Sequence, residues 1–255
     1  MLEIMKNRTS IICLALVVLA FTNCSKESAN STNTSSGAGG STARFTIAGS
    51  YLYVVDQSSL KSFLISNPQS PLFKSKTEIG INIETIFPYG DKLFIGSSSD
   101  MYIFSLADPS RPQQVGRATY QIRMSCDPVV VQNGVAYATL RAAGPCGGWG
   151  TSSLVVYDIS NVSSPSLVNT VPLSEPYGLG VKDSALYVCD AASGLNVFNI
   201  KDKFSPQQVL TITDKQFFDV IPYDGILICQ VSDGFALYDI SKDATKPEYI
   251  STILN

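Results

Sequence analysis

The sequence contains 255 residues, of which 45% are hydrophobic and 15% are charged, and its formal net charge is −3. This apolar content suffices for one or two ordinary hydrophobic cores. No basic cluster is present, which argues against a nucleic-acid partner. The sequence contains no histidine, which excludes His-based catalytic triads and His-ligated metal sites. We therefore expect no metal and no cofactor, and we assign no catalytic residue.

The first 23 residues have the pattern of a secretory signal peptide. Lys6 and Arg8 precede an apolar run over residues 11–21, which is too short to span a membrane comfortably. The following letters, FTNCSKE around Cys24, resemble the lipobox of bacterial lipoproteins. This resemblance implies cleavage before Cys24, lipidation of its thiol and attachment to the membrane. It also implies an outer-membrane lipoprotein of the cell envelope, of the Bacteroidetes type, with surface exposure left open.

Residues 25–42 consist mainly of Ser, Thr, Asn, Gly and Ala. Such a composition cannot bury a core and is typical of a flexible linker. With about 5–6 Å × √n for a flexible chain, this segment reaches on the order of 20–25 Å. We therefore expect a lipidated Cys24 and a tether over residues 24–42, followed by a folded domain over residues 43–255.

One pattern recurs five times in the folded domain: an aromatic residue, then an Asn or Asp, then a proline four residues later. The prolines follow one another after 41, 53, 41 and 41 residues, and such a period indicates a repeat architecture. We interpret the Asn or Asp as structural, because its side chain can bond the backbone two residues on and close a turn before the outer strand. The five pairs are Asn67 with Pro71, Asp108 with Pro112, Asn161 with Pro165, Asp202 with Pro206, and Asp243 with Pro247.

The fourth repeat contains four strand-like segments, at residues 177–181, 185–189, 195–200 and 208–212. Four short strands in a unit of about 40 residues predict one blade of a β-propeller. We therefore predict an all-β fold, a propeller of four-stranded antiparallel blades, most simply five. The approximate blades are 43–80, 81–122, 123–173, 174–214 and 215–255. We expect blade one to pack on blade five and close the ring; an open solenoid is the alternative.

Two short sequences recur at corresponding places in the repeats. LYVVD at residues 52–56 is matched by LYVCD at residues 186–190, and an aromatic-Asp-Ile-Ser sequence occurs at residues 157–160 and 238–241. With these elements the sequence resembles the LVIVD-repeat family of bacterial β-propeller lipoproteins over residues 43–255. The resemblance implies an extracytoplasmic or surface location, and it implies no particular chemistry.

The third repeat carries an insertion of 12 residues, 141–152, between its second and third strands. Because strand directions alternate, this loop should share a face with residues 123–127, which enter the first strand. Export permits disulfides, so we predict a bond between Cys126 and Cys146, with two unpaired thiols as the alternative. We expect Cys189 and Cys229, in second strands, to be buried and unpaired.

The single tryptophan, Trp149, lies in this glycine-rich insertion. Exposed aromatic residues often mark a binding surface, although Trp149 could equally cap blade three. On the same face we expect a shallow aromatic site with a few charges, suited to a glycan, a peptide or a protein loop. Its other candidate residues are Arg123, Asp127, Glu84, Tyr177, Phe217, Phe218 and Asp219.

These features favour a membrane-anchored module that binds a protein or glycan ligand. A structural envelope protein without a small ligand is the alternative, and a carboxylate-based glycan hydrolase or lyase ranks third. The hydrolase hypothesis requires two carboxylates about 5–9.5 Å apart. Its candidates are Glu84, Asp127 and Asp219.

Overall fold

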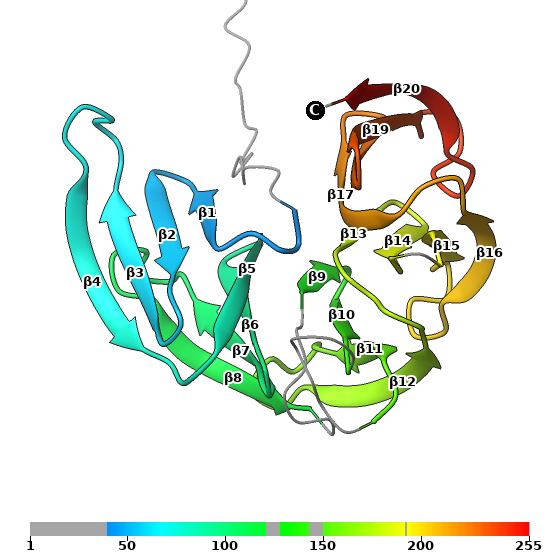
Figure 1. Cartoon of the computed structure of the whole chain (residues 1–255). Helices are drawn as coiled ribbons and strands as arrows, with labels where there is room; N and C mark the ends of the chain where they lie inside the picture. The colour runs from blue at the N-terminus through cyan, green and yellow to red at the C-terminus, as the bar shows by residue number, and fades with distance from the viewer. Residues whose placement is uncertain (1–39, 121–127, 143–149, 192, 255) are drawn as a thin grey trace, which may run out of the picture. The chain divides into compact units, whose positions relative to one another are not determined.

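The computed structural model describes residues 40–120, 128–142, 150–191 and 193–254. In these residues, twenty strands form five four-stranded antiparallel sheets, and each sheet uses four strands that are consecutive in sequence (Figure 1). The described ranges include no helix that is long and apolar enough to cross a membrane. This confirms the predicted all-β fold with five four-stranded antiparallel units.

The strands have the following bounds. The first sheet contains β1 (Phe45–Ala48), β2 (Tyr51–Val55), β3 (Ser59–Leu64) and β4 (Leu72–Glu78), and the second contains β5 (Ile83–Tyr89), β6 (Lys92–Ser97), β7 (Asp100–Ser105) and β8 (Gln113–Thr119). The third sheet contains β9 (Val129–Gln132), β10 (Val135–Leu140), β11 (Ser153–Asp158) and β12 (Ser166–Pro172). The fourth contains β13 (Leu179–Lys182), β14 (Ala185–Cys189), β15 (Leu195–Asn199) and β16 (Gln207–Ile212), and the fifth contains β17 (Phe217–Tyr223), β18 (Ile226–Val231), β19 (Gly234–Asp239) and β20 (Glu248–Leu254).

In the third and fifth sheets the first turn follows from its local sequence. Asn133-Gly134 joins β9 to β10, and Asp224-Gly225 joins β17 to β18; all four residues have positive φ angles. A two-residue hairpin turn with positive φ at both positions has the twist that antiparallel strands require, and Asn-Gly and Asp-Gly are the residue pairs that best adopt it.

The recurrent Asn and Asp residues close turns before the outer strands, as predicted. In every repeat the side-chain Oδ1 accepts a hydrogen bond from the backbone N–H two residues later, at 3.0–3.2 Å. The conserved spacing then places a proline directly before the first residue of β4, β8, β12, β16 and β20. The five acceptors are Asn67, Asp108, Asn161, Asp202 and Asp243.

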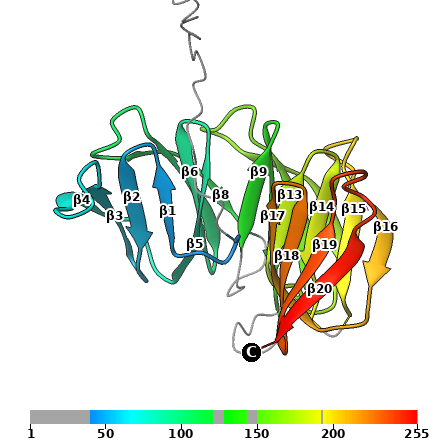
Figure 2. The ribbon, with the colours of Figure 1, turned by 90° about the horizontal axis from the view of Figure 1, so that it is seen from above.

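Successive sheets pack face to face around the inner strands β1, β5, β9, β13 and β17 (Figures 1 and 2). Four apolar clusters join the first sheet to the second, the second to the third, the third to the fourth and the fourth to the fifth. No such cluster joins the fifth sheet to the first among the residues that the structure describes. The expected closure by packing of blade one on blade five is therefore wrong for this structure. The chain that enters β1 makes that connection instead, through Ser41 and Thr42.

Cys189 in β14 and Cys229 in β18 are buried, unpaired and part of the cluster between the fourth and fifth sheets. This confirms the prediction for both residues. Burial raises the pKa of each thiol well above its usual range, which favours the neutral thiol over the thiolate.

Three buried tyrosines connect neighbouring sheets by hydrogen bonds. The hydroxyls of Tyr53, Tyr137 and Tyr187 donate to backbone carbonyls in the turn before the outer strand of the next sheet. The Tyr53 bond to the carbonyl of Pro109 measures 2.9 Å, and the Tyr137 bond to that of Lys203 measures 2.8 Å. Burial raises the pKa of Tyr137 to about 12. These bonds supplement apolar packing with a directional contact.

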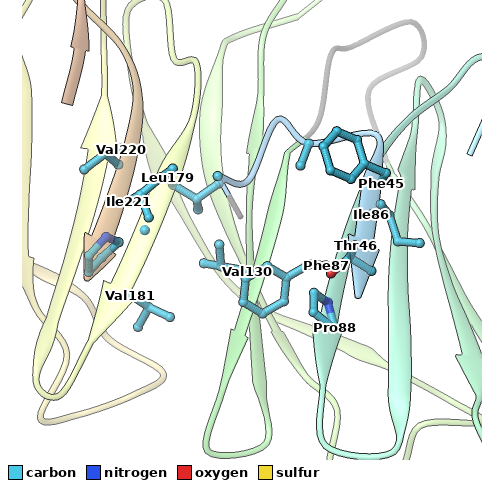
Figure 3. A pocket seen from close by; sticks show the side chains of 14 residues that line it. Phe45, Thr46, Ile86, Phe87, Pro88, Val130, Leu179, Val181, Val220 and Ile221 are labelled. Carbon is cyan, nitrogen blue, oxygen red and sulfur yellow. The ribbon is translucent and has the colours of Figure 1, made fainter. Parts of the chain in front are cut away.

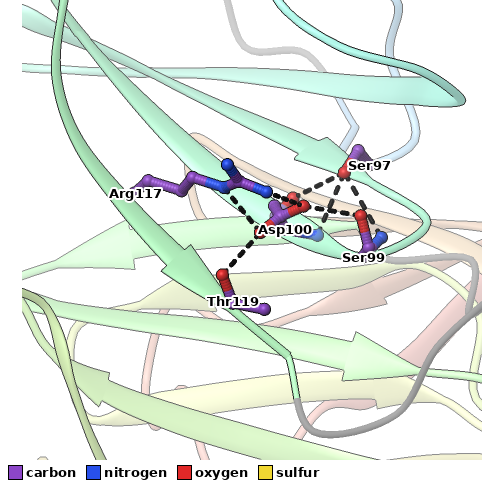
Figure 4. Close-up of polar contacts among 5 residues, drawn as sticks. All are labelled: Ser97, Ser99, Asp100, Arg117 and Thr119. Carbon is purple, nitrogen blue, oxygen red and sulfur yellow. Dashed lines mark hydrogen bonds and ion pairs between the residues drawn. The ribbon is translucent and has the colours of Figure 1, made fainter.

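A buried carboxylate joins two strands of the second sheet. Asp100, at the start of β7, is 1% exposed, and it accepts hydrogen bonds from Arg117 Nε at 2.7 Å and Arg117 Nη2 at 2.8 Å (Figure 4). Ser99 and Thr119 also donate to it. Burial alone would raise the pKa of Asp100, but these hydrogen bonds outweigh burial and hold the pKa below its usual range.

We predict that Tyr137→Phe lowers the free energy of unfolding by about 1–1.5 kcal/mol, because the carbonyl of Lys203 loses its partner. Tyr223→Phe on the exposed end of β17 is the matched control and should change stability by less than about 0.5 kcal/mol. Denaturant titrations at pH 7 measure both variants. Equal effects of the two substitutions would show that the inter-sheet bond contributes nothing.

We predict that Arg117→Met lowers the free energy of unfolding at pH 7 by about 1.5–3 kcal/mol, because the buried carboxylate of Asp100 loses two hydrogen bonds from a half-exposed guanidinium group. Lys61→Met is the matched control: it removes a partly exposed ion pair with Asp56, which contributes at most about 1 kcal/mol.

The effect of Arg117→Met should also depend on pH. The pKa of Asp100 in the folded state lies below its ordinary value of about 3.9, so its contribution is present above that value. The contribution is lost as pH falls through the folded-state pKa. A difference between wild type and Arg117→Met that stays constant down to pH 2 would contradict this account.

Candidate functional site

The loops that enter the first strands and the loops that join second and third strands meet on one face of the sheets. Pro128 precedes β9 and Arg141 follows β10, and both line one cavity of about 200 Å³. The sequence prediction that these two kinds of loop share a face is thus confirmed. We call this cavity the entry pocket. Its residues are Thr42, Arg44, Glu84, Thr85, Pro128, Arg141, Pro176 and Tyr177.

Aromatic and cationic groups are stacked in the entry pocket. The guanidinium carbon of Arg141 lies 3.7 Å from the ring centroid of Tyr177. On Tyr177, the ring of Phe218 packs edge-on, with centroids 5.2 Å apart. Thr139 Oγ1 donates a 2.7 Å hydrogen bond to the Tyr177 carbonyl, and the Tyr177 hydroxyl donates to Glu175. These contacts hold a cation and a flat apolar ring in a defined relative position.

The charges of the entry pocket come from three separate sheets. Arg44 precedes β1, Glu84 lies in β5 and Arg141 follows β10. Arginine remains charged at any physiological pH and can bind a carboxylate through two parallel hydrogen bonds. The pocket is therefore suited to a ligand that presents a carboxylate or several hydroxyls beside a flat apolar surface.

Asp219, in β17, holds the chain that precedes β1. Its carboxylate accepts hydrogen bonds from Thr42 Oγ1 at 2.6 Å and Ser41 Oγ at 3.4 Å, and the Ser41 hydroxyl accepts one from the Leu179 N–H at 2.7 Å. We call Ser41, Thr42 and Asp219 the clamp. A Cβ atom on Gly40 would displace the Asp219 carboxylate from the clamp, and a Cβ atom on Gly178 would collide with both that carboxylate and the Asp219 Cα, so position 178 requires glycine. Burial raises the pKa of Asp219, although hydrogen bonds from Thr42, Val220 and Ser41 oppose the rise.

A second cavity of about 200 Å³ lies among the inner strands of all five sheets (Figure 3). Its lining is apolar, with Phe45, Phe87, Val130 and Ile221 among its side chains. Gly40 and Ala43 border this central cavity, while Thr42 and Arg44 border the entry pocket. The clamp therefore fixes a short segment that contributes to both cavities.

The predicted site residues do not all reach the entry pocket. Glu84 and Tyr177 line it, and Phe218 packs on Tyr177. Phe217 is fully buried between the fourth and fifth sheets, so its assignment as a ligand contact is corrected: its side chain belongs to the core. Asp219 anchors the clamp. Six predicted residues lie outside the described residues: Cys24, Arg123, Cys126, Asp127, Cys146 and Trp149.

Sequence reasoning missed the two arginines of the entry pocket. Arg141 is the first residue of the insertion in the third repeat, and Arg44 directly precedes β1. Arg44 directly precedes a first strand and Arg141 directly follows a second strand. The same positional rule that identified the other candidates could therefore have identified both arginines. In the described parts of the chain, no group of three or more Cys, Asp or Glu residues is arranged to hold a metal ion.

Comparison with known proteins identifies the repeats and the fold. Residues 39–78 and 149–172 match the LVIVD repeat model. A search of curated proteins found no match.

Solved structures share the architecture at low sequence identity. A Bacteroides fragilis protein, provisionally described as a 6-phosphogluconolactonase, is 12% identical with a TM-score of 0.64, over 81% of this chain and 68% of that one. The periplasmic gluconolactonase PpgL of Pseudomonas aeruginosa is 13% identical with a TM-score of 0.62, over 81% and 68%. BamB of Moraxella catarrhalis is 10% identical with a TM-score of 0.53, over 83% and 63%.

Similarity at this level shows the fold alone. It agrees with the five four-stranded sheets and the apolar packing between them. The chain is a β-propeller protein that carries LVIVD repeats.

Proposed function

We propose that this protein is a membrane-anchored, extracytoplasmic lipoprotein whose propeller acts as a binding or protein-interaction module. One observation carries the proposal: loops of separate sheets bring Arg44, Glu84, Arg141 and Tyr177 into one pocket. Structural packing alone does not require two arginines and an aromatic ring to meet at a loop face, whereas arginine and tyrosine are enriched where proteins bind partners.

The position of the entry pocket in the chain supports the same proposal. Pro128 directly follows segment 121–127, and Arg141 lies two residues before segment 143–149; the sequence places Arg123 and Trp149 in these two segments. A pocket of about 200 Å³ is small, so it suits one side chain of a protein loop or one sugar ring rather than a large ligand. The ligand we favour is a protein loop with an acidic residue, and a glycan is the competing class.

The hydrolase hypothesis receives less support. Of its three candidate carboxylates, Asp219 is partly buried and already accepts hydrogen bonds from Ser41, Thr42 and the Val220 N–H. Glu84 lines the entry pocket, and Asp127 lies outside the described residues. The hydrolase hypothesis requires two carboxylates that face one scissile bond. Among the described residues, only Glu84 of the three candidates lines the entry pocket.

Membrane attachment rests on the N-terminal sequence. Lys6, Arg8 and the apolar run over residues 11–21 precede Cys24 in the order of a lipoprotein signal. Several acyl chains on Cys24 would bind a membrane stably without a spanning helix, because each buried methylene contributes about 0.8 kcal/mol. The tether over residues 25–42 would then connect the lipid to the propeller.

We predict that Cys24→Ala moves most of the protein out of the detergent phase when membranes are solubilised and partitioned, because the thiol that carries the lipid is gone. Cys13→Ala, within the signal that is removed, is the matched control and should leave the protein in the detergent phase. Retention of Cys24→Ala in the detergent phase would exclude this anchor.

We predict that Arg141→Ala weakens binding of the partner about 30-fold, the effect of losing roughly 2 kcal/mol at a central contact. Chemical cross-linking on intact cells, followed by purification and mass spectrometry, identifies the partner for wild type, and a titration of that partner measures affinity. Lys242→Ala, in the turn after β19 and outside the entry pocket, is the matched control.

Equal capture by wild type, Arg141→Ala and Lys242→Ala would place the binding site elsewhere. If no protein is enriched in any sample, the same variants are tested on a glycan array. Binding there that depends on Arg141 would retain the pocket and change the ligand class.

A further inference from the structure

The turn between the second and third strands carries a carboxylate in four of the sheets. In the first, second and fifth sheets, a Lys or Arg of the same sheet lies 2.7–3.7 Å from this carboxylate. The pairs are Lys61 with Asp56, Arg117 with Asp100, and Lys215 with Asp233. Each of these three sheets therefore supplies its own countercharge.

The fourth sheet has the carboxylate but not the cation. Asp190 directly follows β14 and is 3% exposed. In the parts of the chain that the structure describes, no Lys or Arg forms an ion pair with it. The strand register explains the difference: Asn196 occupies the position of Lys61, and Thr211 occupies that of Arg117.

Only neutral N–H groups hold the Asp190 carboxylate. It accepts hydrogen bonds from the backbone N–H of Glu175 at 2.5 Å and of Ser174 at 3.2 Å, and from Asn196 Nδ2 at 3.4 Å. An ionised carboxylate is an acceptor only, and its two oxygens offer about four acceptor positions. The three donors fix its orientation but bring no positive charge, and a buried carboxylate is most stable when a cation pairs with it.

The Asp190 carboxylate lines a cavity of about 460 Å³, which shares no residue with the entry pocket. We call this cavity the Asp190 pocket. Gln208 Nε2 and Thr211 Oγ1 donate to Asn196 Oδ1 at 3.0 and 2.9 Å, so these polar side chains hold one another in place. Besides Asp190, the lining consists of Pro172, Leu173, Ser174, Ser193, Asn196, Gln208 and Thr211.

We propose that the Asp190 pocket binds a small ligand through a protonated amino group. An ammonium group donates three hydrogen bonds and accepts none, so it complements a carboxylate that has neutral donors but no cation. It would supply the positive charge that Lys61, Arg117 and Lys215 supply in the other sheets. The amide and hydroxyl groups around the carboxylate favour an amine that also carries hydroxyls, as in an amino sugar. This site is separate from the entry pocket and does not depend on the function proposed for it.

The test measures binding to the full chain in detergent at pH 7 by isothermal titration calorimetry. The probes are three amines from different sources: glucosamine, cadaverine, and lysine with its α-amino and carboxyl groups blocked. Glucose and N-acetylglucosamine are the neutral controls. We expect at least one amine to bind, and both neutral sugars to bind at least tenfold more weakly. The order of the three amines identifies the source of the amino group.

Two variants of the Asp190 pocket should each weaken amine binding at least tenfold. Asp190→Asn removes the negative charge and keeps an acceptor for the backbone. Thr211→Arg places a guanidinium at the position that Arg117 has in the second sheet, so it leaves Asp190 in place but supplies the missing cation. Asp56→Asn, at a carboxylate that already has its cation, and Val168→Arg, on exposed β12 outside the pocket, are the matched controls and should bind like wild type.

Melting temperatures show which variants are folded. Thr211→Arg decides the test if Asp190→Asn does not fold, because Thr211 is on an outer strand and holds no backbone group of the connecting chain. The proposal would be overturned if no amine binds to wild type, or if a neutral sugar binds as tightly as the amines. Unchanged amine binding by folded Thr211→Arg would overturn it as well.

Discussion

Face-to-face packing of four-stranded sheets is the interaction on which the rest of this structure depends. In the fourth sheet, β14 is buried along its whole length, and its alternate side chains belong to two different clusters, one on each face. A sheet with apolar residues on both faces cannot be stable alone, because one face would remain in water. Each repeat therefore requires neighbours, and the order of repeats in the sequence becomes the order of sheets in space.

This packing also explains where chemistry can be placed. The sheets fix the ends of their strands, so loops from different repeats meet at one face without contributing to the core. Arg44, Glu84 and Arg141 come from three repeats, yet they line one pocket. All three lie in or beside strand ends and outside the four apolar clusters that join the sheets. The structural Asx residues, by contrast, recur in every repeat because every repeat needs its turn closed.

Much of the fold could be predicted from the sequence because its signals are local and repeated. The Asx turns, the strand limits and the buried thiols of Cys189 and Cys229 each follow from a few neighbouring residues.

The entry pocket was predicted only in part. Strand alternation placed Glu84 and Tyr177 on the correct face, but the same rule could not show that Phe217 points between two sheets while Phe218 points to the loop face. The side chains of adjacent strand residues point to opposite faces of the sheet, and a bulge between Phe217 and Asp219 shifts the strand register. Ser41 and Thr42 are separated from Asp219 by more than 170 residues in the sequence. No local sequence pattern could therefore predict their contact.

The clamp shows that position, and not stability, accounts for one partly buried carboxylate, that of Asp219. An acid whose pKa is raised on folding is stabilising in its protonated form, and this contribution falls as pH rises from the unfolded-state pKa through the folded-state pKa. The raised pKa of Asp219 therefore makes its ionised form unfavourable for folding at neutral pH. Its hydrogen bonds nevertheless fix Ser41 and Thr42 against the fourth and fifth sheets. Those residues directly precede β1, and the segment they belong to borders both cavities. A neutral apolar residue would remove the desolvation penalty but would leave this segment without an acceptor. The carboxylate is thus best understood as the group that sets the boundary between the entry pocket and the central cavity.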